Sequence, residues 1–144
     1  MAVEVRDEMN NLEKALALRA APLFASLSAD ALLPVAALCH QVDLVEGDVL
    51  FEAGEVGDSL FVVASGGVLV KRGNELVARL GVGETVGEMG ALDLEPRSAT
   101  VSAAEPTRLI RLERNDLMDL LTDYPEIMRS MATMLVERIR KSTS

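Results

Sequence analysis

The positions of the glycines constrain the fold of this chain of 144 residues more than any other feature. All ten lie between Gly47 and Gly90, with none before or after that segment. Glycine is favoured where φ must be positive and disfavoured inside helices. A glycine every few residues between short apolar runs therefore predicts strands joined by tight turns, enclosed by helical flanks.

The glycine-rich centre carries β-branched and aliphatic runs that are too short for helices, and similar runs follow it. With turn signals between them, they predict about eight antiparallel strands in a jelly-roll, or double-stranded β-helix, architecture. The fold class is thus mainly β with helical flanks. The runs lie at residues 42–45, 49–51, 60–63, 68–70, 76–80, 100–103 and 108–112.

The N-terminal flank has helical periodicity. Met9, Leu12 and Leu16 recur at helical spacing. A second helix is expected behind Ser28, whose hydroxyl can cap free amides, although Pro34 leaves its start open. The sequence therefore predicts N-terminal helices ahead of the strands.

Two further helices are expected in the C-terminal flank. One is capped near Asn115, and Pro125 opens a longer one over residues 126–142. Arg138 lies near the end of the longer helix, where the helix dipole favours cations. Its broad apolar face predicts packing on the domain or a homodimer seam. That face comprises Ile127, Met128, Met131, Met134, Leu135 and Ile139.

The charge balance argues against several classes of partner. Asp and Glu total 23 against 14 Lys and Arg, and the formal net charge of −9 repels nucleic acids and anionic membranes. No apolar run approaches the roughly 18 residues of a membrane span. One cysteine allows no intrachain disulfide, so the cytoplasm is the expected location.

The sequence offers too few histidines and cysteines for a zinc site. Cys39 and His40 are its only cysteine and histidine, fewer than the three or four ligands of a zinc site. No base–nucleophile pair is evident. We therefore expect no metal, no cofactor and no catalytic residue.

The segment from Gly87 to Thr100, GEMGALDLEPRSAT, carries groups suited to a sugar phosphate. Arg97 can bind an anion, and Glu88 can accept a hydrogen bond from a hydroxyl a sugar's width away. The residues between them can form a short helix whose first amides also point at an anion. Gly87 and Gly90 allow the backbone to approach the ligand closely.

This segment resembles the phosphate-binding cassette of the cyclic-nucleotide-binding domain family, and residues 47–70 match the family's pattern of glycines and strands. The resemblance implies that Glu88 binds the ribose 2′-hydroxyl and Arg97 the phosphate. It assigns the remaining contacts to Gly87 and to the amides of Met89, Gly90 and Ser98. We expect residues 22–144 to form this domain and residues 1–21 an N-terminal helix or linker.

The resemblance implies a regulatory module that binds a 3′,5′-cyclic purine nucleotide, cAMP in preference to cGMP, and repositions its C-terminal helix. Ser98, which follows Arg97, does not distinguish between adenine and guanine as the bound base. Gap-free alignment with a family member whose long helix touches adenine places Ser142 and Thr143 at that contact. An output domain is expected outside this chain. The alternatives are an interaction module that has lost the ligand and, less favoured, a hydrolase.

Overall fold

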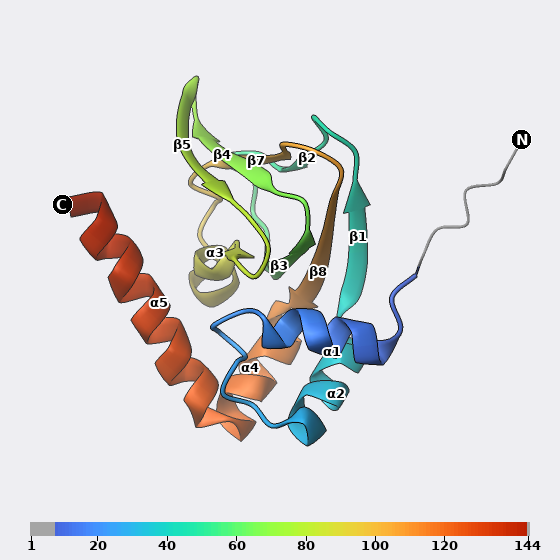
Figure 1. Cartoon of the computed structure of the whole chain (residues 1–144). Helices are drawn as coiled ribbons and strands as arrows, with labels where there is room; N and C mark the ends of the chain where they lie inside the picture. The colour runs from blue at the N-terminus through green and yellow to red at the C-terminus, as the bar shows by residue number, and fades with distance from the viewer. Residues whose placement is uncertain (1–7, 144) are drawn as a thin grey trace, which may run out of the picture.

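The structure, a computed structural model, describes residues 8–143 and the side chains of residues 8–141. Its elements are α1 (Asn11–Arg19), α2 (Ala29–Leu38), β1 (His40–Leu44), β2 (Val49–Phe51), β3 (Ser59–Ser65), β4 (Val68–Arg72), β5 (Glu75–Leu80), β6 (Thr85–Val86), α3 (Glu88–Asp93), β7 (Thr100–Ala103), β8 (Thr107–Glu113), α4 (Arg114–Asp123) and α5 (Pro125–Thr143). The strands form two antiparallel sheets, ordered β1-β8-β3-β6 and β2-β7-β4-β5. Helices α1, α2 and α4 gather at one end, and α5 runs along one side past α3 (Figure 1). The predicted eight-stranded jelly roll with helical flanks is confirmed.

Strand β3 is buried on both faces. Successive side chains of a strand point to opposite faces of the sheet. Leu60 and Val62 belong to the hydrophobic core shared with the helices, whereas Phe61 and Val63 belong to the core between the two sheets. Double burial explains why this strand appears in the sequence as a continuous apolar run.

The N-terminal helices pack into the same core as β3. The predicted cap is confirmed, since the Ala31 amide donates to Ser28 Oγ at 3.2 Å. Helix α1 exists as expected, but it buries Ala15 and Leu18. Leu12 and Leu16 remain exposed.

Two details of the strands and helices differ from the prediction. The strand β6 has two residues and pairs with β3, too short to appear as an apolar run. The helix predicted to be capped near Asn115 is present as α4, but it begins at Arg114 with Glu113 in the N-cap position, so Asn115 is not its cap. Strand β8 also ends at Glu113, so the chain passes from strand to helix without a separate capping residue.

The apolar face that the sequence predicts for α5 is only partly buried. Ile127 and Met131 are buried in the core, and Met134 and Leu135 are half-buried against it. Met128 and Ile139 are exposed. The first half of α5 is therefore anchored by apolar packing, and the second half needs other contacts.

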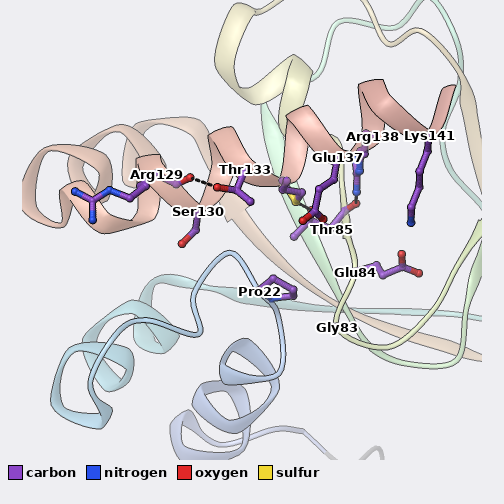
Figure 2. Close-up of a pocket in the computed structure, with 11 residues that line it drawn as sticks. Pro22, Gly83, Glu84, Thr85, Arg129, Ser130, Thr133, Glu137, Arg138 and Lys141 are labelled. Atoms are coloured by element: carbon purple, nitrogen blue, oxygen red, sulfur yellow. Dashed lines mark hydrogen bonds between the residues drawn. The ribbon is translucent and has the colours of Figure 1, made fainter. Parts of the chain in front are cut away.

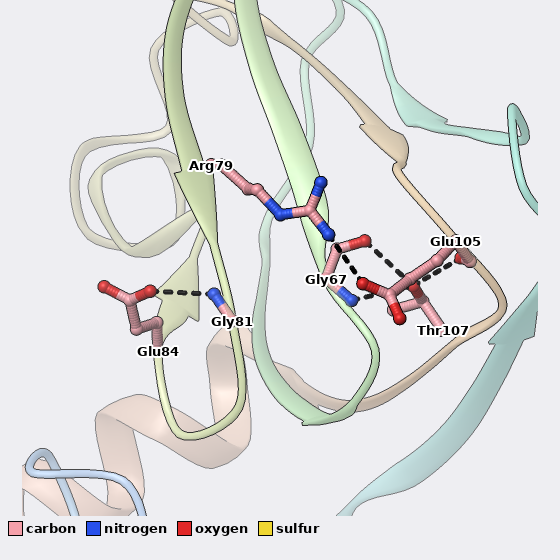
Figure 3. Close-up of polar contacts among 6 residues, drawn as sticks. All are labelled: Gly67, Arg79, Gly81, Glu84, Glu105 and Thr107. Atoms are coloured by element: carbon pink, nitrogen blue, oxygen red, sulfur yellow. Dashed lines mark hydrogen bonds and ion pairs between the residues drawn. The ribbon is translucent and has the colours of Figure 1, made fainter.

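Polar contacts join the start of β4 and the strand β5 to the chain between β7 and β8. The Thr107 hydroxyl accepts a hydrogen bond from the Gly67 amide at 3.1 Å, and Arg79 Nη2 lies 2.6 Å from Glu105 Oε2 (Figure 3). Both partners of the ion pair are exposed, so its contribution to the free energy of unfolding is small. Arg79 can therefore serve as a control position in binding experiments.

Leu94, at the end of α3, has an unfavourable backbone conformation. Its φ is 58°, in the left-handed region, and its side chain is exposed. This conformation costs a non-glycine residue roughly 1–2 kcal/mol. Leu94→Gly should therefore raise the free energy of unfolding by about 1 kcal/mol, measured by urea denaturation. Leu76→Gly, at an exposed position of β5, should lower it, and a lower urea midpoint for Leu94→Gly would contradict the strain argument.

Candidate functional site

The guanidinium of Arg97 is buried in a slot between β3 and the start of α3. Arg97 is 7% exposed. Its Nη1 donates to the Gly87 carbonyl and its Nη2 to the Ser59 carbonyl, each at 3.0 Å. The structure thus brings Arg97 and Gly87 together as the sequence predicts, and it adds Ser59.

Three glycines leave room for this guanidinium. A Cβ atom built on Gly57 or Gly87 would lie 2.7 Å from a guanidinium nitrogen of Arg97, and one built on Gly90 would lie 2.8 Å away. Gly87 also has φ of +84°. The expected close approach at Gly87 and Gly90 is therefore present, but toward Arg97 itself. From the sequence, Gly57 is not predicted to take part in the site. The segment before β3, which contains Gly57, is assigned only to a turn.

The backbone around Arg97 is tied to the turn before β3. The Arg97 amide donates to the Glu55 carbonyl at 2.7 Å, and the Gly54 amide donates to the Arg97 carbonyl at 2.8 Å. Burial lowers the pKa of the Arg97 guanidinium, while the nearby Asp58 and Glu55 carboxylates raise it. Arginine remains charged in proteins, so the slot holds a buried cation.

The face of the guanidinium rests on an aromatic ring. Arg97 Cζ lies 4.2 Å from the centroid of the Phe51 ring. Arg97 Nε is buried and has no hydrogen-bond partner. In the sequence, Phe51 has no distinguishing feature beyond its place in an apolar run.

Glu88 is buried at the first position of α3 and contacts α5. It is 2% exposed. Its Oε1 forms an ion pair with Arg138 Nη1, and its Oε2 has no hydrogen-bond partner. Arg138 Nη2 also donates to the Thr85 carbonyl at 2.7 Å. Burial lowers the pKa of Arg138, and Glu84 opposes that shift. Arg138 thus connects α5 to the cassette. From the sequence, Arg138 is explained only by the helix dipole, and this contact is not predicted.

A groove of about 390 Å³ flanks this connection. It lies between α5 and the chain around Gly83–Thr85, with Pro22 at its edge (Figure 2). Met134 and Arg138 both reach across to Thr85, whose hydroxyl lies 2.9 Å from Met134 Sδ. The second half of α5 is therefore held to the barrel through polar contacts beside a groove.

The remaining residues predicted to contact the ligand lie at the surface or at the end of α5. Met89 and Ser98 are both exposed at the cassette. Ser142 and Thr143 lie in the last turn of α5, and their side chains are outside the described residues. Their predicted contact with the base stays a prediction.

Cys39 and His40 do not form a reactive pair. Burial raises the pKa of the Cys39 thiol to about 12, so the thiol is protonated at neutral pH. His40 is exposed. Within residues 8–143, no group of three His, Cys, Asp or Glu side chains could hold a metal ion. Over the same range, no helix has both the length and the apolar character to cross a membrane.

The site thus combines a buried cation and a buried carboxylate on one short segment. Each has a polar atom without a partner, Arg97 Nε and Glu88 Oε2. An uncompensated buried polar atom is costly. A small anion that also carries a hydroxyl group can supply a hydrogen-bond partner to both atoms.

Comparison of the sequence with known proteins identifies a family that matches this chain. The sequence model of the family described as "Cyclic nucleotide-binding domain" matches residues 41–124. The chain is 36% identical over 83% of its length to a cyclic nucleotide-gated potassium channel of Rhizobium etli, covering 33% of that protein. It is 38% identical over 67% of its length to the cyclic AMP receptor protein of Thermus thermophilus, covering 47% of it.

Structural comparison agrees. The crystal structure of the Thermus thermophilus catabolite activator protein matches with a TM-score of 0.78 and 31% identity, over 85% of this chain and 60% of that chain. The chain thus spans a third to a half of the length of these two curated relatives. The predicted boundary between residues 21 and 22 lies outside the matched segment 41–124 and stays a prediction.

Proposed function

The chain belongs to the cyclic nucleotide-binding domain family, and from that membership we propose that it is a non-catalytic regulatory module that binds a 3′,5′-cyclic purine nucleotide, cAMP in preference to cGMP. One observation carries the proposal. Arg97 and Glu88, both more than nine-tenths buried, each have a polar atom without a partner in the same cassette. The name of the Thermus relative, a cyclic AMP receptor protein, supports the choice of base.

Arg97 holds the cyclic phosphate in this proposal. Two of its N–H groups are engaged by backbone carbonyls, whereas Nε has no partner. A guanidinium has five N–H groups, so donors remain for a phosphate oxygen. Since Nε is buried, the phosphate can reach it only if the cassette shifts. Amides of Met89, Gly90 and Ser98 complete the anion site.

Glu88 holds the ribose. Its Oε1 is occupied by Arg138, and its buried Oε2, which has no partner, can accept a hydrogen bond from the 2′-hydroxyl once the cassette shifts. A hydrogen bond to a charged acceptor contributes roughly 1.5–3 kcal/mol. Ribose binding and the docking of α5 therefore use the two oxygens of one carboxylate.

This shared carboxylate couples the ligand to α5. A nucleotide that fixes Glu88 also favours the position of α5 in which Arg138 contacts both Glu88 and Thr85. A ligand shifts such an equilibrium only by its differential affinity for the two positions. We place Ser142 and Thr143, in the last turn of the helix, near the purine.

The signal passes to other parts of a larger assembly. Met128 and Ile139 leave exposed apolar surface on α5, which suits a homodimer through this helix. The chain spans only part of its relatives, so we place the output in a further domain or a separate protein in the cytoplasm. Neither nucleic acid nor membrane is a direct partner of this acidic domain.

Calorimetric titration with cAMP and with cGMP tests the proposal. We expect heat with both nucleotides and a lower Kd for cAMP. Hydrogen exchange of residues 126–141 should slow at saturating cAMP. Absence of heat with both ligands would favour the alternative, an interaction module that has lost its nucleotide. Unchanged exchange with bound cAMP would remove the coupling to α5.

A further inference from the structure

The face of the Arg97 guanidinium lies over the ring of Phe51. We infer that Phe51 is a positioning residue for the anion site, holding Arg97 in the slot without itself accepting any of its N–H groups. Its effect on nucleotide affinity rests on the proposed function. The restraint on Arg97 is a property of the protein alone.

The geometry is that of a buried cation–π pair. Arg97 Cζ lies 4.2 Å from the ring centroid, within the roughly 6 Å over which such pairs attract. Arg97 is 7% exposed and Phe51 is 8% exposed, so water screens the contact little. Cation–π attraction is strongest under this condition.

The ring completes a restraint that hydrogen bonds alone do not supply. The carbonyls of Gly87 and Ser59 bind the two terminal nitrogens, and Phe51 covers the face of the group. These contacts come from β2, β3 and the residue before α3. Together they fix both the position and the plane of the guanidinium.

A ring is better suited to this task than a carboxylate. A buried carboxylate would stabilise the cation by accepting its N–H groups, and it would then compete with a phosphate for them. The nearby Asp58 and Glu55 carboxylates are exposed, and neither accepts a hydrogen bond from the Arg97 side chain. The ring interacts through its face, so it stabilises the charge without using a donor.

Phe51 also packs in the core between the sheets, and packing alone would explain its burial. Its ring lies 6.2 Å from the ring of Phe61 in the same core. Phe61 therefore provides a matched control, since Phe61→Leu makes the same chemical change in the same core. Of these two rings, Phe51 is the one over the guanidinium.

The first test measures cAMP affinity by calorimetry. Phe51→Leu should weaken binding by about tenfold, from the loss of a buried cation–π pair. Phe61→Leu, which also replaces a ring of this core, should change the Kd by less than about threefold. Equal losses of affinity in the two variants would assign the effect to the core and overturn the inference.

The second test needs no nucleotide. Urea unfolding of the wild type, Phe51→Leu, Arg97→Gln and the double variant forms a double-mutant cycle. We expect the double variant to lose less stability than the two single losses combined, because either change alone already removes the contact. Additive losses would overturn the positioning role even if cAMP binds. Non-additive losses with no cAMP binding to the wild type would instead reject the proposed function and leave the restraint on Arg97 intact.

Discussion

Replacing Arg97 with alanine should weaken cAMP binding by at least about 100-fold. The variant removes the buried cation and at least two charge-assisted hydrogen bonds to the phosphate, each worth roughly 1.5–3 kcal/mol. It also leaves the carbonyls of Gly87 and Ser59 without their present donor. Calorimetric titration, with circular dichroism to establish folding, provides the measurement.

Two further variants separate the charge from its geometry. Arg97→Lys keeps the charge but not the planar guanidinium with its two terminal nitrogens, so we expect an intermediate loss of affinity. Arg79→Ala removes an exposed arginine of β5 that pairs with Glu105, and it should leave the Kd unchanged. Equal cAMP binding by Arg97→Ala and the wild type would refute the assignment of the phosphate site.

Glu88→Ala should both weaken cAMP binding by about 10- to 100-fold and loosen α5. The variant removes the acceptor for the ribose hydroxyl, worth roughly 1.5–3 kcal/mol. It also removes the ion-pair partner of Arg138. Comparison of cAMP with 2′-deoxy-cAMP measures the first effect. The wild type should prefer cAMP, and Glu88→Ala should bind the two ligands almost equally.

Arg138→Met separates the two roles of Glu88. This variant leaves the carboxylate in place but cuts the contacts of α5 with Glu88 and Thr85. It should speed hydrogen exchange in the second half of α5 and keep the preference for the 2′-hydroxyl. Glu84→Gln, at an exposed carboxylate near Arg138, should change neither measurement appreciably. A lost hydroxyl preference in Arg138→Met would place Arg138, not Glu88, at the ribose.

The sequence predicted most of the fold because burial and turn formation leave local patterns. The residues of β3 form an apolar run because they are buried on both faces, and Ser28 caps α2 through a contact three residues away. The strand β6 left no pattern, since its two residues gain their structure from pairing with β3. Asn115 has the chemistry of a cap, but the continuous passage from β8 to α4 gives that position to Glu113.

The candidate site was predictable only where its residues are neighbours in the sequence. Glu88 and Arg97 lie in one segment whose spacing is typical of a known cassette. Arg138 and Phe51 reach the same place from elements distant in the chain, and neither has a local signature. The charge of Arg138 is already explained by its place near the end of a helix, so the sequence contains no sign of a partner. Its pairing with Glu88 becomes visible only in the folded structure.

The slot around Arg97 also links recognition to the order of assembly. Its walls come from Phe51, Gly57, Ser59 and Gly87, so β2, β3 and the start of α3 must meet before the guanidinium is held. A partly folded chain with one sheet formed would lack this cation site. In refolding experiments, the recovery of cAMP binding should therefore follow the joining of the two sheets and not the formation of helices alone, which makes the ligand a reporter of that joining.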